Sequence, residues 1–93
     1  MQINSKTILK NLIGENLISG ENKPLSLGEA LSNILLNDKV GSKMKCYILA
    51  EKFFKDNTVE IDEADLSLVK ESIQRTELYN NLVNGQLLIL IGK

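Results

Sequence analysis

The stretch "SLGEALSNILL", residues 26–36, carries the clearest structural signal in this chain. Ser26 stands three residues before Glu29, which is the spacing of a capping box. In that motif the serine hydroxyl accepts a backbone hydrogen bond and the glutamate reaches back to the start of the helix. Apolar residues then recur every three or four positions, so they share one helix face. They are Leu27, Ala30, Leu31, Ile34 and Leu35. The pattern predicts an amphipathic helix over residues 26–37.

Two more helices are predicted after Gly41, which ends the connection that follows the first helix. One spans residues 42–55, and its broad apolar side consists of Met44, Tyr47, Ile48, Leu49 and Phe53. The other spans residues 62–75, because Asp62 is a favourable N-cap and Asp65 lies in the first turn, where the helix dipole favours negative charge. Its buried face consists of Leu66, Val69 and Ile73.

The last segment, "ELYNNLVNGQLLILI", predicts a fourth helix over residues 77–91. It has two adjoining apolar faces, made by Leu78, Leu82, Leu87 and Ile91 and by Tyr79, Val83, Leu87 and Leu90. Gly85 weakens this helix by about 1 kcal/mol relative to alanine. Residues 87–91 are also rich in apolar and β-branched side chains, so a strand that pairs with the N-terminal segment is an alternative.

Residues 1–24 are predicted to be extended, with a small β-hairpin, because apolar and β-branched residues alternate there with the breaks at Gly14 and Gly20. A short helix over residues 6–13 is the alternative. The tripeptide "GEN" occurs at 14–16 and at 20–22, which is too short to indicate an internal repeat. The predicted fold is mainly α (α+β): a single small domain over residues 1–93 with three to four short amphipathic helices and an N-terminal β-hairpin.

Composition limits the classes of function. The 93 residues include 11 basic and 12 acidic side chains, a net charge of −1. Nucleic-acid binding is not expected, since it calls for a basic excess. The longest apolar run, "LLILI", is far shorter than the roughly 20 residues of a membrane span, and the N-terminus lacks the apolar core of a signal peptide. A single cysteine permits no internal disulfide. We therefore expect a soluble cytoplasmic protein with no membrane contact.

Catalytic chemistry finds little support in the residue types. The chain has no histidine, which removes the usual general base and most zinc sites. Cys46 follows Lys45, which could lower the thiol pKa, but such a cysteine is more often a small buried hydrophobic residue. An enzyme or metal protein based on carboxylates would use Glu60, Asp62, Glu63 and Asp65. Acidic residues beside a helix start are more often caps and solvated surface. We expect no enzyme, no cofactor and no bound metal.

The stretch "DNTVEIDEADL", residues 56–66, resembles the second half of a calcium-binding EF-hand loop. With Ile61 at the hydrophobic loop position, the first ligand position falls on Phe54 and the glycine position on Val59. The last position falls on Asp65, where the motif requires a bidentate glutamate. The remaining oxygens do not complete a calcium site, so we interpret the stretch as a turn, a short strand and a capped helix.

Binding through apolar surface is the function that the pattern favours. Four amphipathic elements present more apolar surface than a small monomer easily covers. The predicted interaction surface is Leu87, Leu88, Ile89, Leu90 and Ile91. Because this segment is apolar on all sides, it is either the central element of the core or a surface that docks on another protein, including a second copy in a homodimer.

The order of segments resembles small uncharacterised proteins of tailed phages and prophages. The similar segments are "ILKNLIGENL" (8–17), "PLSLGEALSNILL" (24–36) and "VEIDEADLSLVKESI" (59–73). The resemblance implies an accessory protein that inhibits or modulates a host protein, such as a defence factor, in the host cytoplasm. The alternative is a chaperone or structural partner in virion assembly. No catalytic residue follows from the resemblance.

Overall fold

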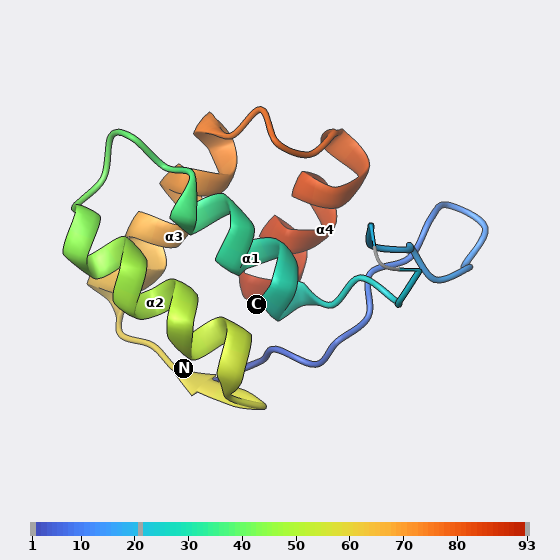
Figure 1. Ribbon diagram of the computed structural model, residues 1–93, viewed down its shortest axis with the longest axis horizontal. Coiled ribbons are helices and arrows are strands. Elements are labelled where there is room, and N and C mark those ends of the chain that lie inside the picture. The colour runs from blue at the N-terminus through green and yellow to red at the C-terminus, as the bar shows by residue number, and fades with distance from the viewer. Residues whose placement is uncertain (1, 21, 93) are drawn as a thin grey trace.

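The computed structural model describes residues 2–20 and 22–92. Over these residues the chain forms four helices and a two-stranded antiparallel sheet (Figure 1). The elements are β1 (Gln2–Asn4), α1 (Leu27–Leu36), α2 (Lys43–Lys55), β2 (Thr58–Glu60), α3 (Glu63–Arg75) and α4 (Asn81–Ile91). The prediction of a mainly helical fold with a small β component is confirmed.

Each helix begins after a polar residue whose side chain accepts a backbone hydrogen bond. Ser26 accepts from the Glu29 N–H at 3.1 Å, and Asp62 accepts from the Asp65 N–H at 2.8 Å. Such bonds satisfy N–H groups that have no partner within the helix. The predicted start of the last helix at residue 77 is wrong, because Asn80 is the N-cap of α4 and residues 76–80 form the connection from α3.

The core is built around α1, which packs against α2 and α3, while α3 also packs against α4. The apolar face predicted for α1 is buried. Gly28 allows the close approach of three segments: a side chain there would lie 2.2 Å from the Phe53 carbonyl oxygen and within 3 Å of Ser5. Gly28 and Ser5 thus lie at the point where the N-terminal segment, α1 and the end of α2 meet.

The face of α2 that enters the core differs from the prediction. Met44, Tyr47 and Ile48 are exposed, although the sequence pattern placed them on the apolar side. The buried face consists of Cys46, Leu49, Ala50 and Phe53. These four residues also follow helical spacing, and two of them are small, which lets α2 approach α1 closely. Phe53 fills the core at the end of this face, while Met44, Tyr47 and Ile48 remain on the outside of α2.

The β component joins the two halves of the chain. β1 pairs with β2 in antiparallel register, with Ile3 opposite Val59 and both side chains buried. Ser5 extends this contact, because its N–H donates to the Asn57 carbonyl oxygen at 2.9 Å. The two-stranded sheet thus joins β1 to a distant strand, while the extended segments predicted for the N-terminal region pair with one another only through isolated antiparallel bridges. Its strands are far apart in sequence, and the sequence pattern carries no signal for such a pairing.

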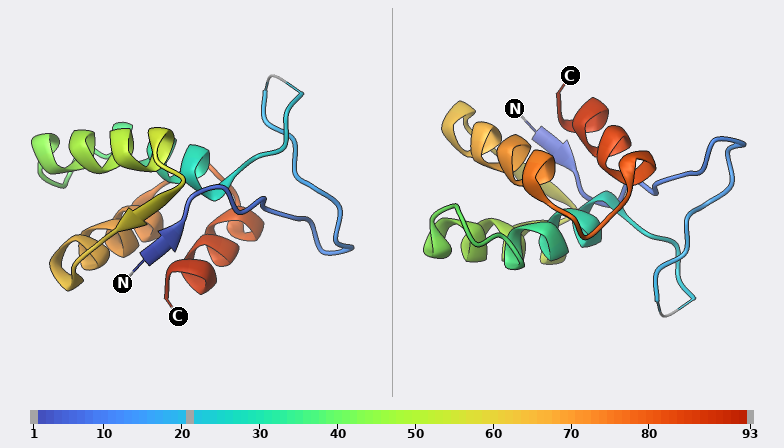
Figure 2. Two further views of the ribbon diagram at one scale, coloured as in Figure 1. Left: turned by 90° about the horizontal axis from the view of Figure 1, so that it is seen from below. Right: turned by 90° about the horizontal axis from the view of Figure 1, so that it is seen from above.

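Residues 6–20 and 22–26 belong to an arm that projects from the helices in every view (Figures 1 and 2). Three extended segments of the arm pair through isolated bridges, Ile8–Ser26, Lys10–Asn16 and Ile18–Pro24. At its centre the Leu9 N–H donates to the Leu25 oxygen, the Leu25 N–H to the Leu17 oxygen, and the Leu17 N–H to the Leu9 oxygen, at 2.7–2.9 Å. The backbone bonds of these three leucines thus close into a ring. The alternative prediction of a short helix over residues 6–13 is wrong.

Two turns of the arm have the same backbone design, eight residues apart. In the first, the Asn11 N–H donates to the Glu15 oxygen and the Gly14 N–H to the Asn11 oxygen. Ser19, Asn22 and Lys23 repeat both bonds in the second. Gly14 and Asn22 have φ values of 89° and 63°, as in a three-residue hairpin loop that ends in a left-handed residue. The structural repeat has a period of eight residues, so the spacing of the two "GEN" tripeptides did not reveal it.

Candidate interaction surface

The predicted interaction surface, residues 87–91, is divided by the fold. Leu87 and Ile91 are completely buried and belong to the core. Leu88 is partly buried, while Ile89 and Leu90 remain exposed on α4. The segment is helical, so the alternative of a strand is wrong. Only the Ile89 side of this segment is available to a partner.

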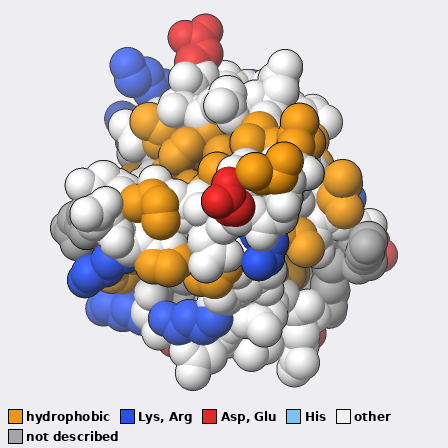
Figure 3. Space-filling view, turned by 90° about the vertical axis from the view of Figure 1, so that its right-hand side faces the viewer, with side chains coloured by type: hydrophobic (Ala, Val, Ile, Leu, Met, Phe, Trp, Pro, Cys, Tyr) orange, Lys and Arg blue, Asp and Glu red, His pale blue; other side chains and the backbone are white. Residues whose placement is uncertain are grey.

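The most exposed apolar side chains lie instead at the tip of the arm. Leu12 is 93% exposed and Ile13 is 79% exposed. Both occupy the corner of the first turn, and Ile18 adds a third exposed apolar residue on the same arm. On the face from which the arm projects, hydrophobic side chains gather across the middle with few charged side chains among them (Figure 3). This surface is the strongest candidate for contact with a partner.

The turn geometry does not require apolar residues at this tip. Leu12 and Ile13 hold corner positions of a turn whose backbone bonds are made by Asn11, Gly14 and Glu15. The second turn repeats these backbone bonds with a different sequence, Gly20 and Glu21 at the corresponding places in the chain. Local folding therefore does not explain why two large aliphatic side chains occupy the first corner.

The arm is held in place at its base and at its tip. The Gln86 side chain on α4 accepts a hydrogen bond from the Lys10 N–H at 2.9 Å and donates one to the Lys10 oxygen. The Asn11 side chain accepts bonds from the Ile13 and Glu15 N–H groups at 3.1 and 3.0 Å. Such a side-chain turn fixes the corner. The apolar tip is therefore presented in a defined orientation.

A second apolar surface lies between α1 and α2. A groove of about 250 Å³ is lined by Ser32, Asn33, Leu36, Tyr47, Ala50, Glu51, Phe54 and Lys55. Its exposed apolar side chains are Leu36, Tyr47 and Phe54. Glu51 lies on the rim, where its carboxylate is 3.3 Å from the Tyr47 hydroxyl and 3.7 Å from the Lys55 ammonium. One of the residues that the sequence pattern assigned to the core of α2, Tyr47, thus forms part of this groove.

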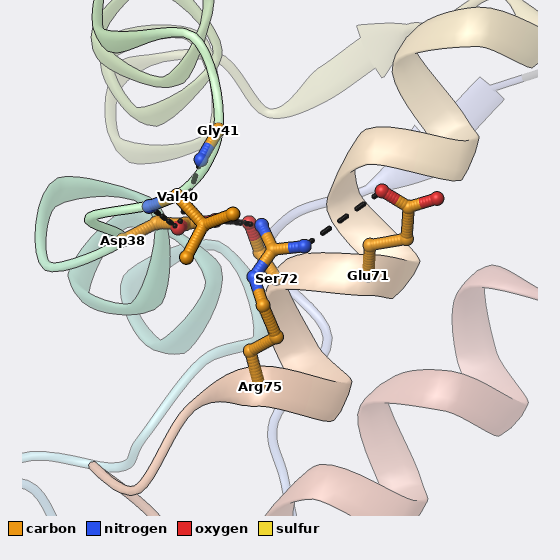
Figure 4. A network of polar contacts seen from close by, with 6 residues as sticks. All are labelled: Asp38, Val40, Gly41, Glu71, Ser72 and Arg75. Carbon is orange, nitrogen blue, oxygen red and sulfur yellow. Dashed lines mark hydrogen bonds and ion pairs between the residues drawn. The ribbon is translucent and has the colours of Figure 1, made fainter.

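The third feature is a polar network beside a cavity of about 390 Å³ (Figure 4). The Asp38 carboxylate is buried and accepts hydrogen bonds from the Ser72 hydroxyl, from Arg75 Nη2 at 2.6 Å, and from the Val40 and Gly41 N–H groups at 2.8 and 3.2 Å. Sequence reasoning missed it, because Asp38 and Arg75 lie on different elements.

The bonds of the network favour the ionised form of Asp38. Burial raises the pKa of Asp38, but the bonds from Ser72, Val40, Arg75 and Gly41 outweigh it and hold that pKa well below its usual range. A carboxylate with four donors on its two oxygens has little capacity left to accept a substrate proton. Asp38 therefore links the segment between α1 and α2 to the end of α3.

Cys46 is buried in the fold, and two residues of the acidic cluster, Asp62 and Asp65, make contacts at the start of α3. Cys46 is buried beneath Gly41. Burial raises the pKa of its thiol, the Asp38 charge adds to this rise and Arg75 opposes it, so the suggested activation by Lys45 is wrong. Lys45 instead pairs with Asp65 at 2.9 Å. Among the acidic residues, Asp62 caps α3. Within the described residues, no group of three cysteine or acidic side chains could hold a metal ion.

Comparison of the chain with protein-family models, curated proteins and solved structures gave no match. No helix within residues 2–20 and 22–92 has the length and hydropathy to cross a membrane. The arm tip, the groove between α1 and α2, and the Asp38 network are thus the features from which a function has to be inferred.

Proposed function

We propose that this chain is a non-enzymatic accessory protein that acts by binding another protein. The observation that carries the proposal is the arm tip, where Leu12 and Ile13 are held in solvent by a hydrogen-bonded turn. An apolar group presented on a fixed backbone loses little conformational entropy when it binds. Exposed apolar surface that the fold does not need is typical of an interaction site.

The class of partner comes from the resemblance to phage and prophage proteins. On that basis the chain is a phage-type modulator of a host protein, such as a defence factor, in the host cytoplasm. The charges agree with a protein partner, because a net charge of −1 offers no excess of cations for nucleic acid. The roles of Asp38, Cys46 and Asp62 in holding the fold support a function without catalysis.

Virion assembly is the second candidate function, and the projection of the arm favours it. An arm that extends beyond its own helices can insert into a neighbouring subunit (Figure 2). The two candidates differ in the origin of the partner: host modulation requires a host protein, whereas assembly requires a viral one.

The proposal is tested by affinity capture from lysates of uninfected and phage-infected bacteria, with the full chain immobilised. Wild type is compared with Ile13→Glu on the arm and Ile89→Glu on α4, since both positions are exposed. We expect Ile13→Glu to lose the captured protein and Ile89→Glu to keep it. The opposite pattern would return the interaction surface to α4, and retention by both variants would contradict the role of the arm.

The source of the captured protein separates the two candidate functions. A protein found in both lysates and encoded by the host supports modulation. A protein present only after infection and encoded by the phage supports assembly.

A further inference from the structure

We propose that the outer face of α2 binds an amphipathic segment of another protein, one in which acidic residues flank an apolar stripe. α2 contains four lysines and one glutamate, which gives this helix a net charge of +3. The rest of the chain contains seven basic and eleven acidic side chains, a net charge of −4. The helix is thus strongly positive in a chain that is otherwise negative, and its outer face shares no residue with the arm tip, Leu12 and Ile13.

Two of the four lysines of α2 have acidic partners, and two do not. The ammonium groups of Lys45 and Lys55 lie 2.9 and 3.7 Å from a carboxylate oxygen. Lys43 and Lys52 are exposed, and neither forms an ion pair within the part of the chain that the structure describes. These two cations remain after the pairs within the chain are counted, so the complementary occupant is anionic.

Exposed apolar side chains lie between the two unpaired lysines. They are Met44, Tyr47, Ile48 and Phe54. Helical spacing places all four on one side of α2. Lys43 stands one turn before Tyr47, at one edge of this stripe, and Lys52 stands one turn after Ile48, at the other edge. The two lysines are about 14 Å apart along the axis, from the rise per residue of an α-helix. The occupant therefore needs apolar residues at its centre and carboxylates on both sides.

The groove between α1 and α2 favours a protein segment as the occupant. The groove has a volume of about 250 Å³, and its apolar walls include Leu36 and Phe54. A helix of a partner can place apolar side chains in such a groove, whereas a lipid surface presents no projecting group. Glu51 lies on the rim, where its carboxylate opposes a layer of anionic headgroups or a continuous phosphate backbone. Acidic residues that stand only at the two edges avoid this repulsion.

Isothermal titration calorimetry of the full chain with synthetic helical peptides tests the proposal. The first peptide has leucine at every third or fourth position and glutamate on both edges of that stripe. The control peptide has glutamine in place of every glutamate. We expect the wild type to bind the acidic peptide at least about tenfold more tightly at low salt, and we expect added salt to reduce the difference because it screens exposed charges.

Variants of α2 locate the contact. Lys43→Glu combined with Lys52→Glu should weaken binding of the acidic peptide at least about tenfold, since both attractions become repulsions. Phe54→Ala should weaken binding of both peptides, because it removes an apolar wall of the groove. Lys10→Glu makes the same change of charge on the arm and should bind as the wild type does, as should Ile13→Glu. Circular dichroism verifies that the variants are folded, which we expect because all five side chains are exposed.

A third peptide, with lysine in place of every glutamate, separates a direct contact from a loss of structure. It should bind the double variant more tightly than it binds the wild type, because the signs of both surfaces are then exchanged. A double variant that has merely lost its structure would bind neither charged peptide.

Several results would overturn the proposal. These are equal affinity for the acidic and neutral peptides, no binding of either, and a loss in Lys10→Glu as large as that in the double variant. Tighter binding to vesicles of equal parts phosphatidylserine and phosphatidylcholine, or to single-stranded oligodeoxythymidine, would assign the face to a lipid or a nucleic acid instead. A reversible wild-type dimer that Phe54→Ala abolishes in sedimentation would assign it to a second copy of the chain.

Discussion

The helices and the arm use apolar residues in different ways. In α1, Leu27, Leu31 and Ile34 occupy the positions that face the core, and all three are buried. In the arm, Leu9 and Leu25 are buried within its central ring of backbone bonds, whereas Leu12 and Ile13 lie in solvent at a corner that backbone bonds already define. Where an apolar side chain is buried, its contribution to stability explains why an apolar residue occupies that position. The apolar residues at the arm tip are not buried, so we assign them to binding.

Phe53→Ala should have the largest effect on stability. Phe53 is buried against α1, and removing its ring leaves a cavity at a cost of about 3–5 kcal/mol. Phe54→Ala is the matched control, since the neighbouring ring is 64% exposed and should change stability by less than about 0.5 kcal/mol. Urea unfolding measures both. Equal losses would mean that the assignment of the buried face of α2 is wrong.

Asp38→Ala should have the next largest effect, at about 3 kcal/mol, because it removes the acceptor of the Ser72 hydroxyl, of Arg75 Nη2 and of two backbone N–H groups. Lys45→Ala breaks an exposed ion pair and should cost much less. Urea unfolding near neutral pH compares the two variants. A loss at Asp38 no larger than that at Lys45 would contradict the structural role of the network.

The same carboxylate predicts a pH dependence. The pKa of Asp38 is lowered in the folded chain from its ordinary value of 3.8, so folding favours the ionised form. The contribution of Asp38 to the free energy of unfolding is complete well above pH 3.8. It is lost as the pH falls below that value toward the pKa of the folded chain. Wild-type stability should therefore decrease in this acid range more steeply than that of Asp38→Asn. Parallel pH profiles would show that Asp38 is not the responsible group.

The sequence predicted the helices more accurately than the contacts between segments. The caps Ser26 and Asp62 and the apolar face of α1 are local patterns, and the structure confirms them. The buried face of α2 could not be predicted in the same way, because the helix has apolar residues on two sides. Packing against α1 determines that the side with Cys46 and Ala50 is buried.

The arm and the polar network could not be predicted for a different reason. The ring of the arm joins backbone groups of Leu9, Leu17 and Leu25, and backbone bonds leave no mark on residue type. The bond between Asp38 and Arg75 links residues on separate elements, so neither neighbourhood in the sequence indicates it. For the candidate site, the sequence indicated that apolar surface is in excess, but not that most of it lies on the arm and α2.

Two glycine substitutions should change stability in opposite directions by about 1 kcal/mol. Gly14 has a φ of 89°, which an L-residue adopts only with strain, so Gly14→Ala should destabilise the arm by about 1–2 kcal/mol. Gly85 lies inside α4 with open space around it, so Gly85→Ala should stabilise by about 0.5–1 kcal/mol. Thermal unfolding of both variants is the measurement, and a stabilising Gly14→Ala would contradict the left-handed turn.

Ile13→Glu should have the smallest effect on stability and shows most directly how the arm differs from the helices. The side chain is 79% exposed, so its loss should change the free energy of unfolding by no more than about 0.5 kcal/mol. The variant also gives the first turn the residue type that stands eight positions later, at position 21. Urea unfolding of the wild type and of Ile13→Glu under the same conditions measures this change in the free energy of unfolding.

A loss of several kcal/mol in Ile13→Glu would mean that the arm tip packs within its own chain and that its apolar character serves folding after all. Unchanged stability would leave binding as the remaining physical reason for an isoleucine at that corner, because an exposed aliphatic side chain gains nothing from water. The arm would then differ from the helices in a specific sense: the apolar residues at its tip contribute free energy only once a partner covers them.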